Sequence, residues 1–224
     1  MVKTCEALKE KILHKAAKYL ETGVEELEFD GKRVYKPACG EDGTKKEISI
    51  KDLANRVQCA NEDALQVTQS HSSPISPPPF MAGAAEVEVD LETGQVELIK
   101  FAAAVDCGTP LNENLARVQT EGGLVQGIGM ALYEDVSYSK DGKVHENSFM
   151  QYKVPSRLDV GRVQVEFESS FEPTGPFGAK SIGEVVINTP SPAIANAVYN
   201  AVGVRIRELP ITAEKVFKGM NGLD

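Results

Sequence analysis

The segment at residues 172–184 constrains the backbone more than any other part of this sequence. It holds two prolines and three glycines in thirteen residues, which excludes a regular helix or strand and predicts one tight, irregular course. Gly178 and Gly183 bracket its last turn, where we expect a side chain to obstruct close approach of the backbone to another group. Glu184 ends the segment, and the apolar run at residues 185–187 that follows it predicts a strand.

Glu184 is a candidate general base. A carboxylate at the mouth of an apolar strand loses hydration, and this makes it a better proton acceptor. A solvated glutamate in an ordinary surface turn is the alternative. The residues of the segment alone leave both interpretations open.

Residues 114–133 predict a helix that carries four glycines, at positions 122, 123, 127 and 129. Each glycine inside a helix costs about 1 kcal/mol relative to alanine, so close approach of a ligand or of another backbone must offset roughly 4 kcal/mol. Gln126 offers a primary amide beside Gly127, which has no side-chain bulk. The alternative is a helix packed tightly against a neighbour through its glycine face. The run lacks the Lys-Ser/Thr of a phosphate-binding loop.

The remaining patterns predict an α+β fold of mainly antiparallel strand hairpins, with helices packed on one side. Period-two alternation marks hairpins at residues 22–35 and 85–105 and a strand at 162–169. Helical periodicity and capping mark residues 5–20, the stretch after Ser49, and 191–202 before Gly203. Asp106 and Asn112 are expected to tie loops and cap helices.

Three parts follow from these patterns. Residues 1–69 form an N-terminal helix and hairpin part, residues 70–83 a proline-rich connecting loop, and residues 84–224 a C-terminal part with the glutamate loop. The connecting loop holds four prolines and four serines between positions 70 and 79. It is either a plain linker or a long, fixed loop that crosses a larger body.

The composition excludes several classes of protein. A net charge of −9 without any basic cluster argues against a nucleic-acid or anionic-membrane surface. The lack of an apolar signal region or a membrane-length run makes the cytoplasm the expected location. Four cysteines (5, 39, 59 and 107) and three histidines (14, 71 and 145) show no metal-ligand spacing. We therefore expect no direct metal ligands, reduced cysteines packed as small hydrophobes, and surface histidines.

Three ordered motifs carry a resemblance to a known family. One is the run Gly178-Ala179-Lys180-Ser181-Ile182-Gly183-Glu184. The second leads from Asp106-Cys107-Gly108 through Asn112 to Gln126-Gly127-Ile128-Gly129. The third is the corner Tyr152-Lys153-Val154-Pro155. Together they resemble the molybdenum-binding subunits of the xanthine dehydrogenase and aldehyde oxidase family, and the resemblance runs from about Cys5 to the end of the chain.

The resemblance implies roles for single residues. Glu184 would be the catalytic base, and Gln126 would present its amide to an oxygen ligand of the molybdenum. Gly127, Lys180 and Gly183 would also contact the molybdopterin cofactor, although Lys180 could instead order the loop, contact the substrate or be a solvated lysine. The fold would be that of the C-terminal molybdopterin-binding domain of xanthine dehydrogenase.

The resemblance also implies a reaction and partners. It implies hydroxylation of an N-heterocycle, preferably xanthine or another purine, with oxygen from water and with electrons leaving through iron–sulfur and FAD subunits. A Gly-Gly-x-Phe-Gly-x-Arg segment that the family carries near the metal has no counterpart here. We therefore expect the chain to bind the cofactor only with the missing N-terminal half of the molybdenum subunit, and to be inactive alone. The alternatives to a purine hydroxylase are a non-catalytic scaffold or assembly fragment of such an enzyme, and a family member that acts on aldehydes or nicotinate.

Overall fold

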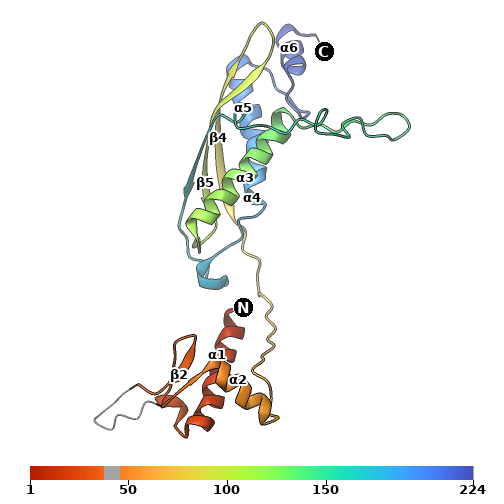
Figure 1. Ribbon diagram of the computed structural model, residues 1–224. Coiled ribbons are helices and arrows are strands. Elements are labelled where there is room, and N and C mark those ends of the chain that lie inside the picture. Colours follow the sequence, from red (N-terminus) through yellow and green to blue (C-terminus); the bar gives the residue numbers. More distant parts are fainter. Residues whose placement is uncertain (38–45, 224) are drawn as a thin grey trace. The chain divides into compact units, whose positions relative to one another are not determined.

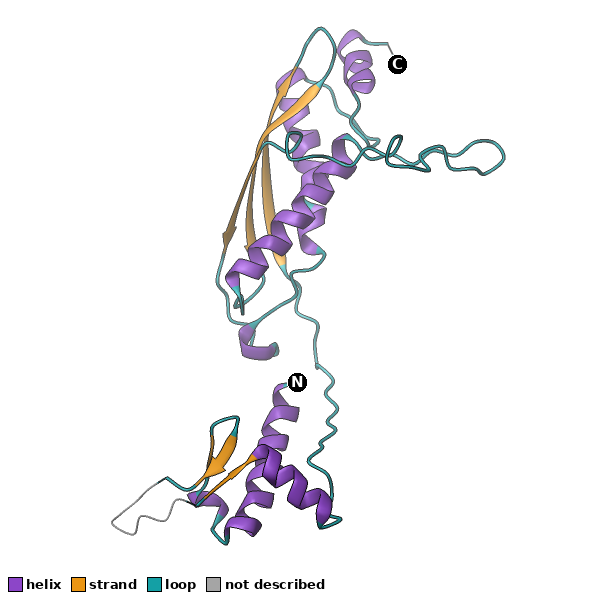
Figure 2. Ribbon diagram, viewed as in Figure 1, coloured by secondary structure: helices purple, strands orange, loops and turns teal. Residues whose placement is uncertain are grey.

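The structure is a computed structural model that describes residues 1–37 and 46–223, so Cys39 lies outside the described residues. The chain divides into two units, Met1–Ser73 and Pro74–Asp224, which Figures 1 and 2 show in ribbon form. The division falls within the predicted connecting loop. The loop is shorter than predicted, because strand β4 (Phe80–Val89) begins inside it. None of the described helices is both long and apolar enough to cross a bilayer.

The first unit packs two helices against a small antiparallel sheet. Its elements are α1 (Val2–Leu20), the 3-10 turn η1 (Val24–Glu26), β1 (Glu28–Phe29), β2 (Arg33–Tyr35), β3 (Glu47–Ser49) and α2 (Ile50–Cys59). The sheet order is β1-β2-β3. The first helix and the hairpin are confirmed, whereas β3 was not predicted. The Ser49 hydroxyl accepts a hydrogen bond from the Asp52 amide, which confirms the predicted cap.

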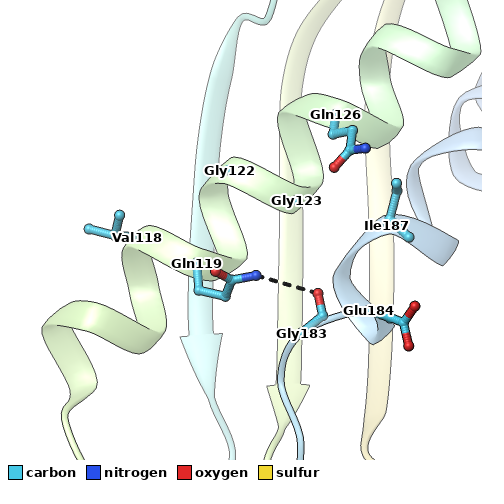
Figure 3. A pocket seen from close by; sticks show the side chains of 8 residues that line it. All are labelled: Val118, Gln119, Gly122, Gly123, Gln126, Gly183, Glu184 and Ile187. Carbon is cyan, nitrogen blue, oxygen red and sulfur yellow. Dashed lines mark hydrogen bonds between the residues drawn. The ribbon is translucent and has the colours of Figure 1, made fainter.

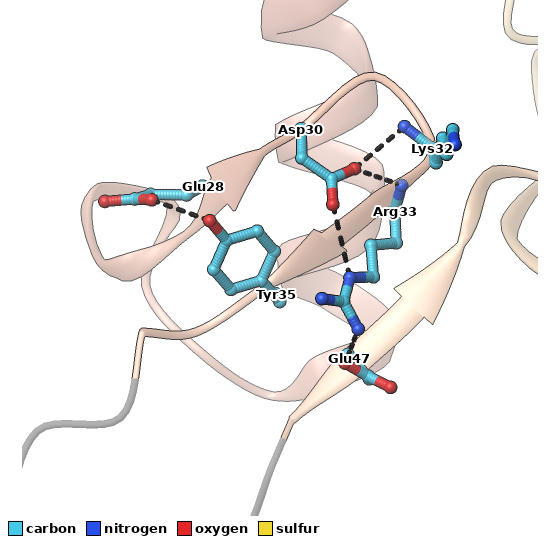
Figure 4. Close-up of polar contacts among 6 residues, drawn as sticks. All are labelled: Glu28, Asp30, Lys32, Arg33, Tyr35 and Glu47. Carbon is cyan, nitrogen blue, oxygen red and sulfur yellow. Dashed lines mark hydrogen bonds and ion pairs between the residues drawn. The ribbon is translucent and has the colours of Figure 1, made fainter.

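Polar side chains fix the register of this small sheet (Figure 4). Asp30 closes the β1–β2 turn by accepting hydrogen bonds from the Lys32 and Arg33 amides, both at 2.8 Å. These two hydrogen bonds lower the pKa of the Asp30 carboxyl. Arg33 also reaches β3, where its guanidinium lies 2.6 Å from a carboxylate oxygen of Glu47. The hairpin and its third strand are therefore joined by side chains as well as by the backbone.

The second unit is built on a mixed sheet of order β4-β5-β6. β4 pairs antiparallel with β5 (Val96–Asp106), whereas β6 (Arg162–Phe167) pairs parallel with β5. The α+β class and the β4–β5 hairpin are confirmed. The sequence predicted mainly antiparallel hairpins, and the parallel pairing of β6 corrects that prediction. Helix α3 carries the chain back along the sheet between β5 and β6, and this crossover lets β6 run in the same direction as β5 (Figure 1).

Helices cover one face of this sheet. The helical elements are α3 (Glu113–Leu132), the 3-10 turn η2 (Pro176–Gly178), α4 (Val185–Asn188), α5 (Pro190–Val202) and α6 (Ala213–Asn221). The Asn112 side chain accepts a hydrogen bond from the Leu115 amide and caps α3, and Gly203 ends α5 with φ 74°. The core joins Phe101 and Val105 of the sheet to Leu124, Ile128 and Ile194 of the helices.

Close packing against α4 and α5 accounts for two of the four glycines in α3. A Cβ on Gly123 would overlap the Val186 side chain, and a Cβ on Gly127 would lie 2.7 Å from Pro190 and 2.9 Å from the Ile187 carbonyl. The glycine face of α3 therefore lets α4 and α5 approach closely. By contrast, a Cβ on Gly122 would meet no atom of the described residues within 4 Å.

This difference predicts opposite effects for one substitution at two positions. Gly122→Ala should raise the free energy of unfolding by up to about 1 kcal/mol, because the helix gains propensity without a clash. Gly127→Ala should lower it, because overpacking costs about 1–3 kcal/mol and exceeds that gain. Urea unfolding of both variants, followed by circular dichroism, measures the difference. Equal stabilisation by both changes would contradict the packing of α3 against α5.

Candidate functional site

A pocket of about 490 Å³ lies between α3 and the residues that lead into α4 (Figure 3). Its lining residues are Val118, Gln119, Gly122, Gly123, Gln126, Gly183, Glu184 and Ile187. Three of the five predicted site residues, Gln126, Gly183 and Glu184, are therefore brought together. The first comes from α3 and the other two from the end of the glutamate loop, more than fifty positions later in the chain.

The α3 wall of the pocket is a consequence of helical spacing. Gln119 and Gln126 are seven positions apart, which is close to two turns, so both amides lie on one face with Gly122 between them. Gln119 donates a hydrogen bond of 3.5 Å from its amide nitrogen to the Gly183 carbonyl oxygen (Figure 3). Gln119 was not predicted as a site residue, although its spacing from Gln126 could have identified it.

Glu184 is exposed and precedes a helix, not a strand. The apolar run 185–187 forms most of α4, and only Val186 is fully buried, against Gly123. The predicted strand is therefore wrong, and so is the argument that an apolar strand removes hydration from Glu184. Among the described residues its carboxylate has no hydrogen-bond or ion-pair partner, and in Figure 3 it extends away from the Gln126 amide.

Gly178 and Gly183, two of the three glycines in the glutamate loop, differ in their surroundings. Gly178 has φ +82°, and a Cβ there would lie 2.7 Å from the Thr109 hydroxyl and overlap the Phe171 ring. The predicted close approach is thus confirmed at Gly178. At Gly183 a Cβ would meet no atom of the described residues within 4 Å, so this chain supplies no group that requires a glycine there. The space beside Gly183 belongs to the pocket.

The other two predicted cofactor contacts lie outside the pocket lining. Gly127 is buried in the contact of α3 with α4 and α5, which gives it a packing role in this chain. The Lys180 side chain is only 7% exposed, and its ammonium lies 2.6 Å from Asp106 Oδ2. A solvated Lys180 is therefore excluded, and the alternative in which it orders the loop agrees with the geometry.

Asp106 is the centre of a polar cluster behind the loop. It accepts hydrogen bonds from Lys180 Nζ and Ser170 Oγ, both at 2.6 Å, and from the Gly108 amide at 2.9 Å. The hydrogen bonds from Lys180 and Ser170 lower the pKa of the Asp106 carboxyl to about 2. Asp106 is thus an ionised loop anchor, as predicted.

The corner Tyr152–Pro155 packs on the end of α3. The Tyr152 hydroxyl donates a hydrogen bond to the Glu134 carboxylate, just after the helix. A Cβ on Gly129 would overlap the Glu134 carboxylate and lie 3.0 Å from the Pro155 ring, so this glycine lets Glu134 and the corner pack close to α3.

The cysteines and histidines that the structure describes give no further site. Cys107 is buried, and burial raises the pKa of its thiol, which agrees with an unreactive residue. Cys5 and Cys59 are exposed, so the expectation that they pack as hydrophobes is wrong. The three histidines are exposed, as predicted. Within residues 1–37 and 46–223, no group of three or more His, Cys, Asp or Glu side chains could hold a metal ion.

Comparison with known proteins identifies the family. The family model described as "Molybdopterin cofactor-binding domain" matches residues 1–161 of the chain. The chain belongs to this family. It is related to the molybdenum-binding subunits of the xanthine dehydrogenase and aldehyde oxidase family, so the predicted resemblance is confirmed.

One curated relative of this molybdopterin-binding chain is the "Probable hypoxanthine oxidase XdhD" of Escherichia coli. The two are 34% identical over 217 residues, which cover 96% of this chain and 22% of the relative. The chain thus spans about a fifth of the length of that relative.

Solved structures confirm the fold of the molybdopterin-binding chain. CO dehydrogenase from Oligotropha carboxidovorans matches with a TM-score of 0.75 and 27% identity, over 98% of this chain and 28% of the other. Aldehyde oxidoreductase from Desulfovibrio gigas matches with a TM-score of 0.59 and 34% identity, over 64% of this chain and 15% of the other.

The pocket residues fit a cofactor that brings its own metal ligands. The pocket offers the Gln126 amide, which has no partner among the described residues, and a bare helix surface at Gly122. An amide can donate to an oxygen atom, and the missing Cβ at Gly122 lets a ligand approach the helix backbone. Gln119, Gln126 and Glu184 are therefore suited to contacts around such a group rather than to direct coordination of a metal.

Proposed function

We propose that this chain forms one side of the active site of a cytoplasmic molybdenum hydroxylase that acts on an N-heterocycle, with xanthine or a related purine preferred. The observation that carries the proposal is the single pocket that brings together Gln126 and Glu184. The purine preference is supported by similarity to a relative named as a hypoxanthine oxidase.

In this proposal each of four pocket residues has one role in catalysis or in cofactor binding. Glu184 accepts the proton of the water-derived oxygen that enters the product, and a positioned carboxylate of this kind contributes about 10²–10⁴-fold to a rate. Gln126 donates a hydrogen bond from its amide and orients the cofactor, while Gly183 and Gly122 leave room for it. When bound, the molybdenum cofactor supplies the redox chemistry, and the protein supplies orientation and the base.

The same proposal assigns the remainder of the enzyme to other segments. The chain corresponds to about a fifth of its relative, and the described pocket is open, with an exposed Glu184. The rest of a molybdenum subunit would close the pocket and share the cofactor, and iron–sulfur and FAD subunits would remove electrons. The chain alone would then bind the cofactor poorly and be inactive.

Co-production tests this function. The chain would be purified with the remaining molybdenum-subunit segment and the two electron-transfer subunits, and the complex analysed for molybdenum and pterin. We expect a loaded complex that hydroxylates xanthine or hypoxanthine faster than nicotinate or benzaldehyde, with oxygen taken from isotopically labelled water.

Two other outcomes would support the alternatives. Preference for benzaldehyde would favour an aldehyde oxidoreductase, a class to which one of the structural relatives belongs by name. A stable complex that contains this chain but holds no cofactor would favour a scaffold without catalytic function.

A further inference from the structure

Lys180 and Asp106 form an ion pair that is shielded from solvent although it lies at a loop. The side chain of Lys180 is 7% exposed and that of Asp106 is 22% exposed, with 2.6 Å between Nζ and Oδ2. The ammonium also lies 5.1 Å from the centre of the Phe80 ring, at the start of β4. Burying two charges is expensive, so such a pair is weak as a device for stability alone. The contacts of the Lys180 ammonium instead join three segments at one point: the end of β5 at Asp106, the glutamate loop at Lys180 and the start of β4 at Phe80.

The backbone of the glutamate loop is fastened at the same place. The Lys180 amide donates to the Cys107 carbonyl at 2.7 Å, and the Thr109 amide donates to the Gly178 carbonyl at 2.8 Å. Gly108 and Ala179 form an isolated antiparallel bridge. The end of β5 thus holds the loop through both its backbone and the Lys180 side chain.

Glu184 lies between this anchor and a second one. After Lys180, the next fully buried side chain is Val186, which packs against Gly123 of α3. Between them, Ile182 is partly buried against the core of the unit, and the Gly183 carbonyl accepts the 3.5 Å hydrogen bond from Gln119. The position of Glu184 on the pocket rim therefore depends on the Lys180 ion pair and the packing of Ile182 on one side, and on buried Val186 on the other.

We propose that Asp106 and Lys180 are positioning residues, whose ion pair fixes the course of residues 181–185 and so places Glu184 at the pocket. The importance for turnover rests on the proposed function. The placement of the loop does not, and it can be measured without cofactor. Lys180 would thus act through Glu184 rather than by touching the cofactor.

Amide hydrogen exchange of residues 181–185 in the full chain tests the placement. The variants are Lys180→Met, Lys180→Arg and the double variant Asp106→Asn/Lys180→Met, which leaves no unpaired charge behind. We expect Lys180→Met and the double variant to speed exchange of this peptide by about tenfold or more, and Lys180→Arg to restore much of the protection. The matched control Lys140→Met changes an exposed lysine of the same unit and should leave the peptide unchanged.

Activity of the loaded complex gives the second readout. Lys180→Met should lower kcat by about 10–100-fold with little change in KM, because a displaced catalytic group reacts more slowly. Glu184→Gln should leave the exchange pattern as in the wild type, so failure of the proposed base and failure of the positioning pair are distinguishable. Wild-type exchange of residues 181–185 in the double variant would overturn the proposal, whatever the activity.

Discussion

Replacing Glu184 by Gln is expected to lower kcat of the loaded complex by about 10²–10⁴-fold, because the isosteric amide cannot accept a proton at neutral pH. The change removes little else, since the Glu184 carboxylate has no partner among the described residues. Molybdenum and pterin content should therefore stay at the wild-type level. The measurement is a steady-state rate per bound molybdenum.

Glu92→Gln is the matched control for this prediction. Glu92 is an exposed glutamate in the turn between β4 and β5, and it does not line the pocket. The same chemical change there should leave kcat unaltered. Equal rates per molybdenum in Glu184→Gln and Glu92→Gln would show that the base is another residue.

Gly108→Ala is expected to give the largest loss of stability of any glycine change considered for this chain. Gly108 has φ +69°, and a Cβ there would lie 2.8 Å from the Lys180 amide nitrogen and overlap the Gly178 carbonyl. The strain of a left-handed alanine and the loss of two backbone hydrogen bonds together amount to about 2–5 kcal/mol. The loop that carries Glu184 would separate from the end of β5.

Gly142→Ala isolates the contribution of backbone strain. Gly142 has φ +76°, close to the value at Gly108, but a Cβ there would meet no atom of the described residues within 4 Å. We expect a loss of only about 1–2 kcal/mol. Urea unfolding of both variants measures the two costs, and equal losses would contradict the close contact between Gly108 and the glutamate loop.

The sequence predicted those features that depend on local chemistry. Ser49 and Asn112 are caps because the oxygen of each side chain accepts a hydrogen bond from the amide of the third helical residue, and this requires no knowledge of the fold. The β4–β5 hairpin follows from period-two alternation around a turn. Gly178 was likewise identified from its place in a proline- and glycine-rich run.

Features that depend on distant partners were predicted incorrectly or not at all. The run 185–187 is apolar and β-branched, and so it resembles a strand, but contact of Val186 with Gly123 and continuation into α5 make it helical. The parallel direction of β6 is set by the crossover through α3 between β5 and β6, which alternation within a strand cannot reveal. The partner of Lys180 is 74 positions away, so no local pattern could distinguish an ion pair from a solvated lysine.

In the candidate site, too, some features could be predicted from the sequence and others could not. The motif resemblance indicated Gln126, Gly183 and Glu184, and the structure places all three on one pocket. The resemblance did not separate these three residues from Gly127 and Lys180, because a motif gives the residues that occur together and does not show which of them face a ligand. Gln119 was missed because it lies outside the motif, although helical spacing places it on the same face.

An experimental structure of the complex loaded with the molybdenum cofactor would test the central claim most directly. We predict that the Gln126 amide and the Glu184 carboxylate both lie within hydrogen-bond distance, roughly 2.6–3.2 Å, of oxygen atoms of the bound cofactor or its substrate. This requires the Glu184 side chain to turn toward α3. A cofactor bound elsewhere, or with both residues out of reach, would contradict the assignment of this pocket.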